Sequence, residues 1–119
     1  MPCEIEYTDE FEQWWDGLSD DAQVSVAAYV ALLDEHGVSL GFPHSSDIKI
    51  ASHTQMRELR PVHKGKPFRV LYAFDPRRMA ILLIGGDKTG NPRWYDEFVP
   101  IADKLFAEHL EQLKSKSNG

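Results

Sequence analysis

The segment from residue 56 to residue 88 constrains the fold of this 119-residue chain more than any other part of the sequence. It contains three runs that are interpreted as strands. Residues 56–61 end at a proline, residues 67–75 are dense in aromatic and β-branched side chains, and residues 79–86 are almost wholly apolar. The breaks at residues 62–66 and 75–78 are short and contain glycine or proline, and Gly85-Gly86 is expected to end the last run. Because connections this short join neighbouring antiparallel strands, the segment predicts a three-stranded meander.

The N-terminal part of the chain predicts a helical hairpin. Thr8 is a suitable N-cap for a first helix, whose apolar residues recur at helical spacing: Phe11, Trp14, Trp15 and Leu18. Gly17 ends or bends this helix, Ser19 begins a second one, and Gly37 is placed to end it. The second helix is expected to bury one apolar stripe: Val24, Ala27, Ala28, Ala31 and Leu32. We expect the two tryptophans to anchor the hairpin to a sheet rather than to form a ligand platform.

The rest of the chain completes an α+β fold. Residues 3–7 alternate as a short strand, and residues 38–54 have the composition of a loop. Apolar spacing from residue 94 to residue 113 predicts a final helix, with Pro100 marking its start or a kink. The predicted order is β-α-α-β-β-β-α, a single domain over residues 1–119. We expect the hairpin and the C-terminal helix to pack on one face of a small, mainly antiparallel sheet.

Composition excludes several classes of protein. The longest apolar run is far too short to cross a bilayer, and the chain opens with acidic residues instead of a basic and apolar leader. The single Cys3 excludes an internal disulfide and suits a reducing compartment, so we expect a cytoplasmic protein with no membrane association. There is no glycine-rich phosphate loop, no cysteine cluster and no HxxxH or HxH spacing among the five histidines. We therefore expect neither a metal nor a cofactor.

The net charge of −6 hides a strong division along the chain. Residues 1–46 contain ten Asp or Glu and no Lys or Arg, whereas residues 47–93 contain ten Lys or Arg and four Asp or Glu. An acidic helical surface beside solvated basic strand edges would account for this division. We favour a basic functional face, because charge of one sign gathered on one face attracts an anionic partner.

The basic side chains on the strands are the candidates for chemistry. Alternation along residues 67–75 places Arg69 opposite the aromatic face, which is the better candidate to meet the helices. Arg69 is therefore expected on an open face that Arg60 can join, with Lys88 just past the third strand. Converging Arg and Lys suit a phosphodiester, whose cleavage through a 2′-hydroxyl needs charge stabilisation, a base and an acid, but no metal. For each arginine taken singly, a salt bridge or a solvated position is the better explanation.

Several of these residues also resemble a known family. The pattern consists of Met56-Arg57-Glu58-Leu59-Arg60, then Arg69-Val70-Leu71-Tyr72, then an apolar strand followed by Asp87-Lys88-Thr89 and a final helix. It resembles the RelE/ParE toxin superfamily, in particular the HigB-like, phage-derived branch of type II toxin–antitoxin systems. The resemblance extends from about residue 5 to residue 110. Family members often have two adjacent lysines in the loop, where this chain has one.

The resemblance implies a toxin that a cognate antitoxin protein neutralises and that cleaves mRNA on the ribosome as a metal-independent endoribonuclease. Carried over by motif, Arg60, Arg69 and Lys88 are the catalytic residues. Further contacts to RNA are expected from basic residues nearby: His53, Arg57, Lys66 and Arg93. Candidates for proton transfer are His53, Glu58 and Tyr72, together with His109 in the final helix. Two alternatives remain, namely a non-catalytic inhibitor of DNA gyrase or another protein, and a degenerate binding module.

Overall fold

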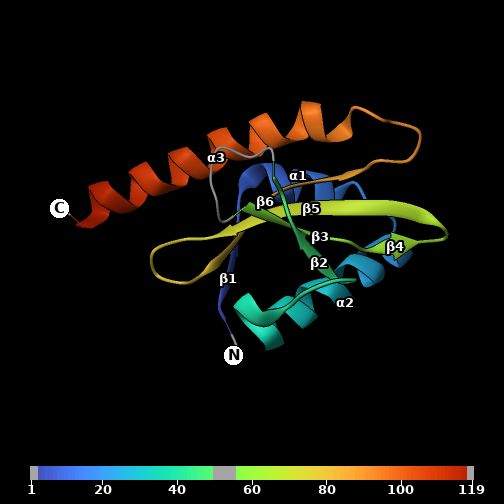
Figure 1. Cartoon of the computed structure of the whole chain (residues 1–119), viewed down its shortest axis with the longest axis horizontal. Helices are drawn as coiled ribbons and strands as arrows, with labels where there is room; N and C mark the ends of the chain where they lie inside the picture. The colour runs from blue at the N-terminus through green and yellow to red at the C-terminus, as the bar shows by residue number, and fades with distance from the viewer. Residues whose placement is uncertain (1–2, 50–55, 118–119) are drawn as a thin grey trace.

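The computed structural model describes residues 3–49 and 56–117 (Figure 1). The helices in this part of the chain are α1 (Asp9–Asp16), α2 (Asp20–His36), the single 3-10 turn η1 (Gly37–Ser39) and α3 (Trp94–Ser117). The strands are β1 (Ile5–Tyr7), β2 (Ser45–Asp47), β3 (Met56–Leu59), β4 (Val62–His63), β5 (Lys66–Phe74) and β6 (Ala80–Asp87). The predicted meander is therefore present as β3, β5 and β6.

The strands form one mainly antiparallel sheet in the order β1-β6-β5-β3-β2, with β4 paired to β5. β1 is parallel to β6, and the other pairs are antiparallel. The β4–β5 hairpin turns at Lys64 and Gly65, whose φ angles of 51° and 78° are those that a tight hairpin turn requires. The predicted α+β class is confirmed.

The prediction that all helices pack on one face of the sheet is wrong. α1 and α2 cover one face, where the core includes Val70, Tyr72 and Leu82, whereas α3 packs with Leu71 and Leu83 on the opposite face. Figure 1 shows the sheet between α3 on one side and α2 on the other. The physical reason is that β5 and β6 carry apolar side chains on both faces, so a helix must pack on each face to remove these side chains from water.

The helical hairpin forms as expected, but α2 buries a different stripe. Thr8 and Ser19 cap the two helices by accepting hydrogen bonds from backbone amides at 3.0 and 3.2 Å. The buried residues of α2 are Ala22, Val26 and Leu33. Most of the predicted stripe faces outward instead: Val24, Ala27, Ala28 and Ala31 are exposed, Val24 by 71%. The larger Leu33, with half-buried Tyr29 and Val30 nearby, removes more apolar surface from water than an alanine row does.

Gly85 and Gly86 lie inside β6 and do not end it. A Cβ atom at Gly85 would lie 2.3 Å from the ring of Trp14, and one at Gly86 would lie 2.6 Å from Nε1 of Trp94. Each glycine thus lets a tryptophan lie directly against the strand, from α1 and from α3 respectively. This contact confirms Trp14 as an anchor of the hairpin.

α3 begins at Trp94, so Pro100 lies within the helix and does not mark its start. Over the described ranges, no helix combines the length and the hydropathy needed to cross a membrane.

Candidate functional site

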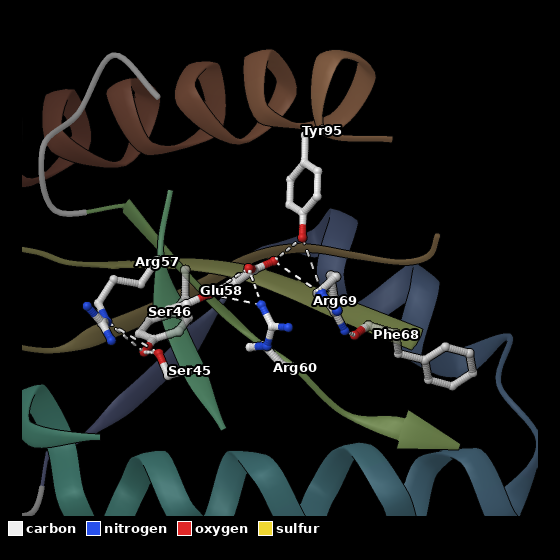
Figure 2. Close-up of polar contacts among 9 residues, drawn as sticks. Ser45, Ser46, Arg57, Glu58, Arg60, Phe68, Arg69 and Tyr95 are labelled. Atoms are coloured by element: carbon white, nitrogen blue, oxygen red, sulfur yellow. Dashed lines mark hydrogen bonds and ion pairs between the residues drawn. The ribbon is translucent and has the colours of Figure 1, made fainter. Parts of the chain in front are cut away.

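The candidate site is centred on the carboxylate of Glu58, which is almost completely buried (Figure 2). Its Oε2 accepts hydrogen bonds from Ser46 Oγ at 2.7 Å and from Arg60 Nη1 at 3.1 Å. Its Oε1 accepts from Tyr95 Oη at 2.7 Å and lies 3.3 Å from Arg69 Nε. One carboxylate therefore holds two guanidinium groups and two hydroxyl groups. We call these five side chains the Glu58 cluster.

The register of the sheet explains why these residues meet. Glu58 lies opposite Leu71 on β5, two residues beyond Arg69 on the same face of the sheet. Arg69 lies opposite Gly86, close to the end of β6. The loop after β6 leads into α3, whose first turn carries Tyr95 back over Glu58 and Arg69. The cluster thus joins β2, β3, β5 and the beginning of α3.

Arg69 is not on an open face, as the sequence had suggested. Its side chain is only 7% exposed, because the helix α3 covers this side of the sheet. Besides its contact with Glu58, it donates to the Phe68 carbonyl at 2.8 Å and to Tyr95 Oη at 3.3 Å. A charge this deeply buried needs such partners, so Arg69 is part of the structure as well as a source of positive potential.

Arg60 is the more accessible arginine, with 27% of its side chain exposed. It donates to Ser46 Oγ at 3.2 Å as well as to Glu58. Its guanidinium carbon lies 5.2 Å from the centre of the Phe42 ring, which is itself 77% exposed. The surface of the cluster therefore combines a cation with an aromatic face.

Lys88 lies beside the cluster, next to Tyr95. Nζ of Lys88 lies 5.3 Å from the centre of the Tyr95 ring, within the range of a cation–π contact. Burial, together with the hydrogen bond to Glu58, raises the pKa of Tyr95 above its ordinary value of 10.0. The Tyr95 hydroxyl is therefore neutral at physiological pH and acts as a donor to the carboxylate.

The structure brings together Arg60, Arg69 and Lys88, but it does not place the other candidates with them. Arg57 points to the opposite face of β3, where it pairs with Asp47 and donates to Tyr72 Oη at 3.3 Å and to the Leu40 carbonyl at 3.0 Å. Lys66 is exposed at the start of β5, and Arg93 is exposed just before α3. His53 lies outside the described residues. Tyr72 faces the core as expected, with its hydroxyl 2.6 Å from Ser45 Oγ.

A second buried carboxylate, Asp75, lies at the other end of the sheet. Its Oδ2 accepts from Arg77 at 2.7 Å and lies 2.9 Å from Nε2 of His109, while its Oδ1 accepts from the backbone amides of Arg77 and Met79. Arg77 also contacts Glu6 of β1 at 2.8 Å. We call Asp75, Arg77, His109 and Glu6 the Asp75 cluster. The basic residues therefore do not form one face, since Arg57 and Arg77 point away from the Glu58 cluster.

Sequence reasoning missed Tyr95, Ser46 and Phe42. Tyr95 is separated from Glu58 by 37 positions, so local spacing does not connect them. The proton-transfer candidate predicted in the last helix was His109, which lies in the Asp75 cluster instead. The signal for Tyr95 was its position in the first turn of the helix that follows the Lys88 loop. Phe42 gave a weaker signal, as a large aromatic residue in a loop otherwise rich in Gly, Pro and Ser.

The cluster holds two guanidinium groups around one carboxylate, and Lys88 lies beside it against Tyr95, so the local net charge is positive although the whole chain is acidic. Arg60 and Lys88 are placed to meet an anion, and Glu58 holds the guanidinium groups in fixed positions. In the described ranges, no group of three or more His, Cys, Asp or Glu is arranged to hold a metal ion.

Comparison with known proteins identifies the family. The family model for "Phage derived protein Gp49-like" matches residues 13–107. The chain is 46% identical over 106 residues to "Putative toxin HigB3" of Mycobacterium tuberculosis, which covers 84% of this chain and 91% of that protein. It is 42% identical over 103 residues to "Putative toxin HigB2" of the same organism, covering 85% of this chain but only 51% of that protein, so it spans about half of that relative's length.

Among solved structures, the chain is similar to the crystal structure of the intact E. coli RelBE toxin–antitoxin complex. The TM-score is 0.42 at 12% identity, with 71% of this chain and 94% of that chain covered. The resemblance to HigB-like, phage-derived proteins is confirmed by the family model and the two sequence relatives. The chain belongs to the family of phage-derived Gp49-like proteins.

Proposed function

We propose that this protein is the toxin of a type II toxin–antitoxin pair and that it cleaves translated mRNA on the ribosome without a metal. The observation that carries the proposal is the Glu58 cluster, in which one buried carboxylate fixes two arginines beside Lys88. The names of the two relatives support the toxin function. The proposal places the protein in the cytoplasm, with the ribosome, mRNA and a cognate antitoxin as partners.

The chemistry follows from the positions of the cations. In cleavage through the 2′-hydroxyl, the 2′-oxygen gives its proton to solvent and forms a bond to phosphorus. The bond from phosphorus to the 5′-oxygen breaks, and that oxygen takes up a proton from solvent. Negative charge grows on the phosphate oxygens, where Arg60 and Lys88 contact them. Arg69 adds positive potential from beneath the surface, where water screens it little. Because Glu58 already fixes the arginines, they need little rearrangement during the reaction.

Phe42 supports RNA as the substrate. Its ring is exposed beside Arg60, and exposed aromatic rings next to cations are where bases of single-stranded RNA stack. A base on Phe42 would place its own phosphate within reach of Arg60.

The test uses purified protein and one mRNA in two states, bound to translating ribosomes and free. New RNA 5′ ends are mapped for the parent, for Arg60→Ala and for Lys104→Ala, which removes an exposed cation on α3 away from the cluster. We expect cuts on ribosome-bound mRNA with the parent and with Lys104→Ala, and cleavage about a hundredfold slower with Arg60→Ala. Absence of new 5′ ends on ribosome-bound mRNA with the folded parent would contradict the proposal and favour a non-catalytic inhibitor of gyrase or another protein.

A further inference from the structure

A cleft of about 470 Å³ lies between α1, α2 and the strand β1. Its apolar lining includes Tyr7, Phe11, Trp15, Ala27 and Val30, and we call it the hairpin groove. Tyr7 is 53% exposed although it is aromatic. The groove lies on the α1–α2 face of the sheet, whereas the Glu58 cluster lies on the α3 face. It is therefore distinct from the candidate site.

The apolar surface of the groove continues along α2. Val24 and Ala31 lie one turn before and after Ala27 and are exposed like it. Asp20 and Asp34 occupy the same helical face at either end of this row. The result is a strip of exposed aliphatic surface that is bounded by carboxylates.

The rim of the groove is acidic on the other side as well. Glu12 and Asp16 lie one turn apart on α1, both exposed, and both line the groove. No Lys or Arg occurs anywhere in residues 1–46, which supply nearly the whole groove. An anionic ligand is repelled here, so RNA does not suit this surface. A second copy of the same face would bring like charges together, so self-association does not suit it either.

We propose that the hairpin groove is the docking site for a segment of a protein partner that carries a short aliphatic run flanked by Lys or Arg. The aliphatic side chains fill the groove and the cations meet the carboxylates of Glu12 and Asp16. If the chain is a toxin, as proposed above, the antitoxin is the partner expected there, and this part of the inference rests on that function. Such docking leaves the Glu58 cluster uncovered.

The chain offers a matched pair of variants to test the groove. Ala27 and Ala28 are adjacent exposed alanines on α2, but only Ala27 lines the groove. Ala27→Arg places a long cation in the groove, and Ala28→Arg makes the same chemical change on a neighbouring face. Arginine is a good helix former, so both variants are expected to keep the parent's circular dichroism and melting temperature.

The probe is a capped synthetic peptide in which a run of leucines has lysines at both ends, compared with a peptide that has glutamates instead. Binding is followed by NMR amide shifts of the whole protein. We expect the lysine peptide to shift groove residues, and Ala27→Arg to weaken its binding at least about tenfold, since like charges are juxtaposed. Ala28→Arg is expected to leave binding unchanged, and Glu12→Gln with Asp16→Asn to weaken it.

Equal binding by Ala27→Arg and the parent, equal binding of the glutamate peptide, or no shift of groove residues would overturn the proposal. The two proposals fail separately. If the protein binds the peptide but cleaves no RNA, only the proposed nuclease function is ruled out. If it cleaves RNA but does not bind the peptide, only the proposed docking site is ruled out.

Discussion

The Glu58 and Asp75 clusters are built from similar parts but differ in what surrounds them. In each, a buried carboxylate binds an arginine and a side chain of α3, which is Tyr95 in one case and His109 in the other. These two α3 residues are 14 positions apart, about 20 Å along a helix. The clusters therefore fasten the same helix to the sheet at two separate points.

The difference lies in the remaining partners. Asp75 accepts two backbone amides of its own turn, and Arg77 is shared with Glu6 of β1, so the charges are nearly balanced. Among the described residues, Glu58 has side-chain partners alone, and two of them are guanidinium groups, with Lys88 nearby against the Tyr95 ring. We infer that the Asp75 cluster, with its nearly balanced charges, stabilises the fold. The Glu58 cluster, with its excess positive charge, also binds a substrate.

The largest effect is expected from Arg69→Ala. This change leaves Glu58 buried with fewer cations, and breaking one partner of a buried ion pair costs about 3–5 kcal/mol of the free energy of unfolding. Urea denaturation of the parent and the variant measures this loss of unfolding free energy. The sequence had suggested an open face and hence a cost within about half a kcal/mol, and a loss that small would show that Arg69 is not structural in this way.

Asp75→Asn should have the next largest effect. The amide keeps one acceptor oxygen but loses the charge that binds Arg77, and hydrogen bonds to charged groups contribute about 1.5–3 kcal/mol. We expect a lower melting temperature and unchanged RNA cleavage per folded molecule. A stable variant that has lost cleavage would reverse the roles of the two clusters.

The pH dependence of stability should separate the clusters with smaller effects. Burial acts to raise the pKa of Asp75, but hydrogen bonds from Arg77, His109 and the backbone outweigh it and lower the pKa below 3.8. Because the folded state holds its proton less tightly than the unfolded state, the contribution of Asp75 is complete above the unfolded pKa and disappears as pH falls through the folded pKa. The stability difference between parent and Asp75→Asn should therefore shrink below about pH 4.

Tyr95 should behave in the opposite direction. Its raised pKa means that the unfolded state loses the phenolic proton first, so stability falls as pH rises above about 10. Tyr95→Phe should remove this alkaline loss and leave the acid limb unchanged. Urea denaturation across pH measures both limbs, and an alkaline loss that persists in Tyr95→Phe would assign it to another group.

Much of the fold could be predicted from local patterns. The caps at Thr8 and Ser19 and the alternation along β5 were sufficient for the helical hairpin and for the faces of the central strand. Local patterns were not sufficient to place α3. A strand with apolar residues on both faces does not indicate which helix covers which face. The α2 stripe was misjudged because residue size, rather than apolar character alone, decided which side was buried.

The candidate site was predictable in part. Arg60, Arg69 and Lys88 were chosen from strand position and motif, and they do lie together. The burial of Arg69 depends on α3, and the contact of Tyr95 with Glu58 joins residues 37 positions apart, so neither follows from local spacing. The Asp75 cluster joins Glu6 to Arg77 across 71 positions and had no sequence signal.

The most direct test of the difference between the clusters compares Arg60→Ala with Arg77→Ala. Both arginines contact a buried carboxylate and both are partly exposed, with 27% and 41% of their side chains accessible. Melting temperature and the rate of cleavage of ribosome-bound mRNA are measured for each variant.

We expect Arg60→Ala, which removes one of the two guanidinium groups on buried Glu58, to lose about 1 kcal/mol of stability, or about 4 °C. It should cleave about a hundredfold more slowly per folded molecule, since one charge-stabilising donor is lost. Arg77→Ala should lose about 1 kcal/mol of stability, or about 4 °C, and cleave at the parental rate. Loss of cleavage in Arg77→Ala with parental cleavage in Arg60→Ala would contradict the assignment of the Glu58 cluster as the functional one.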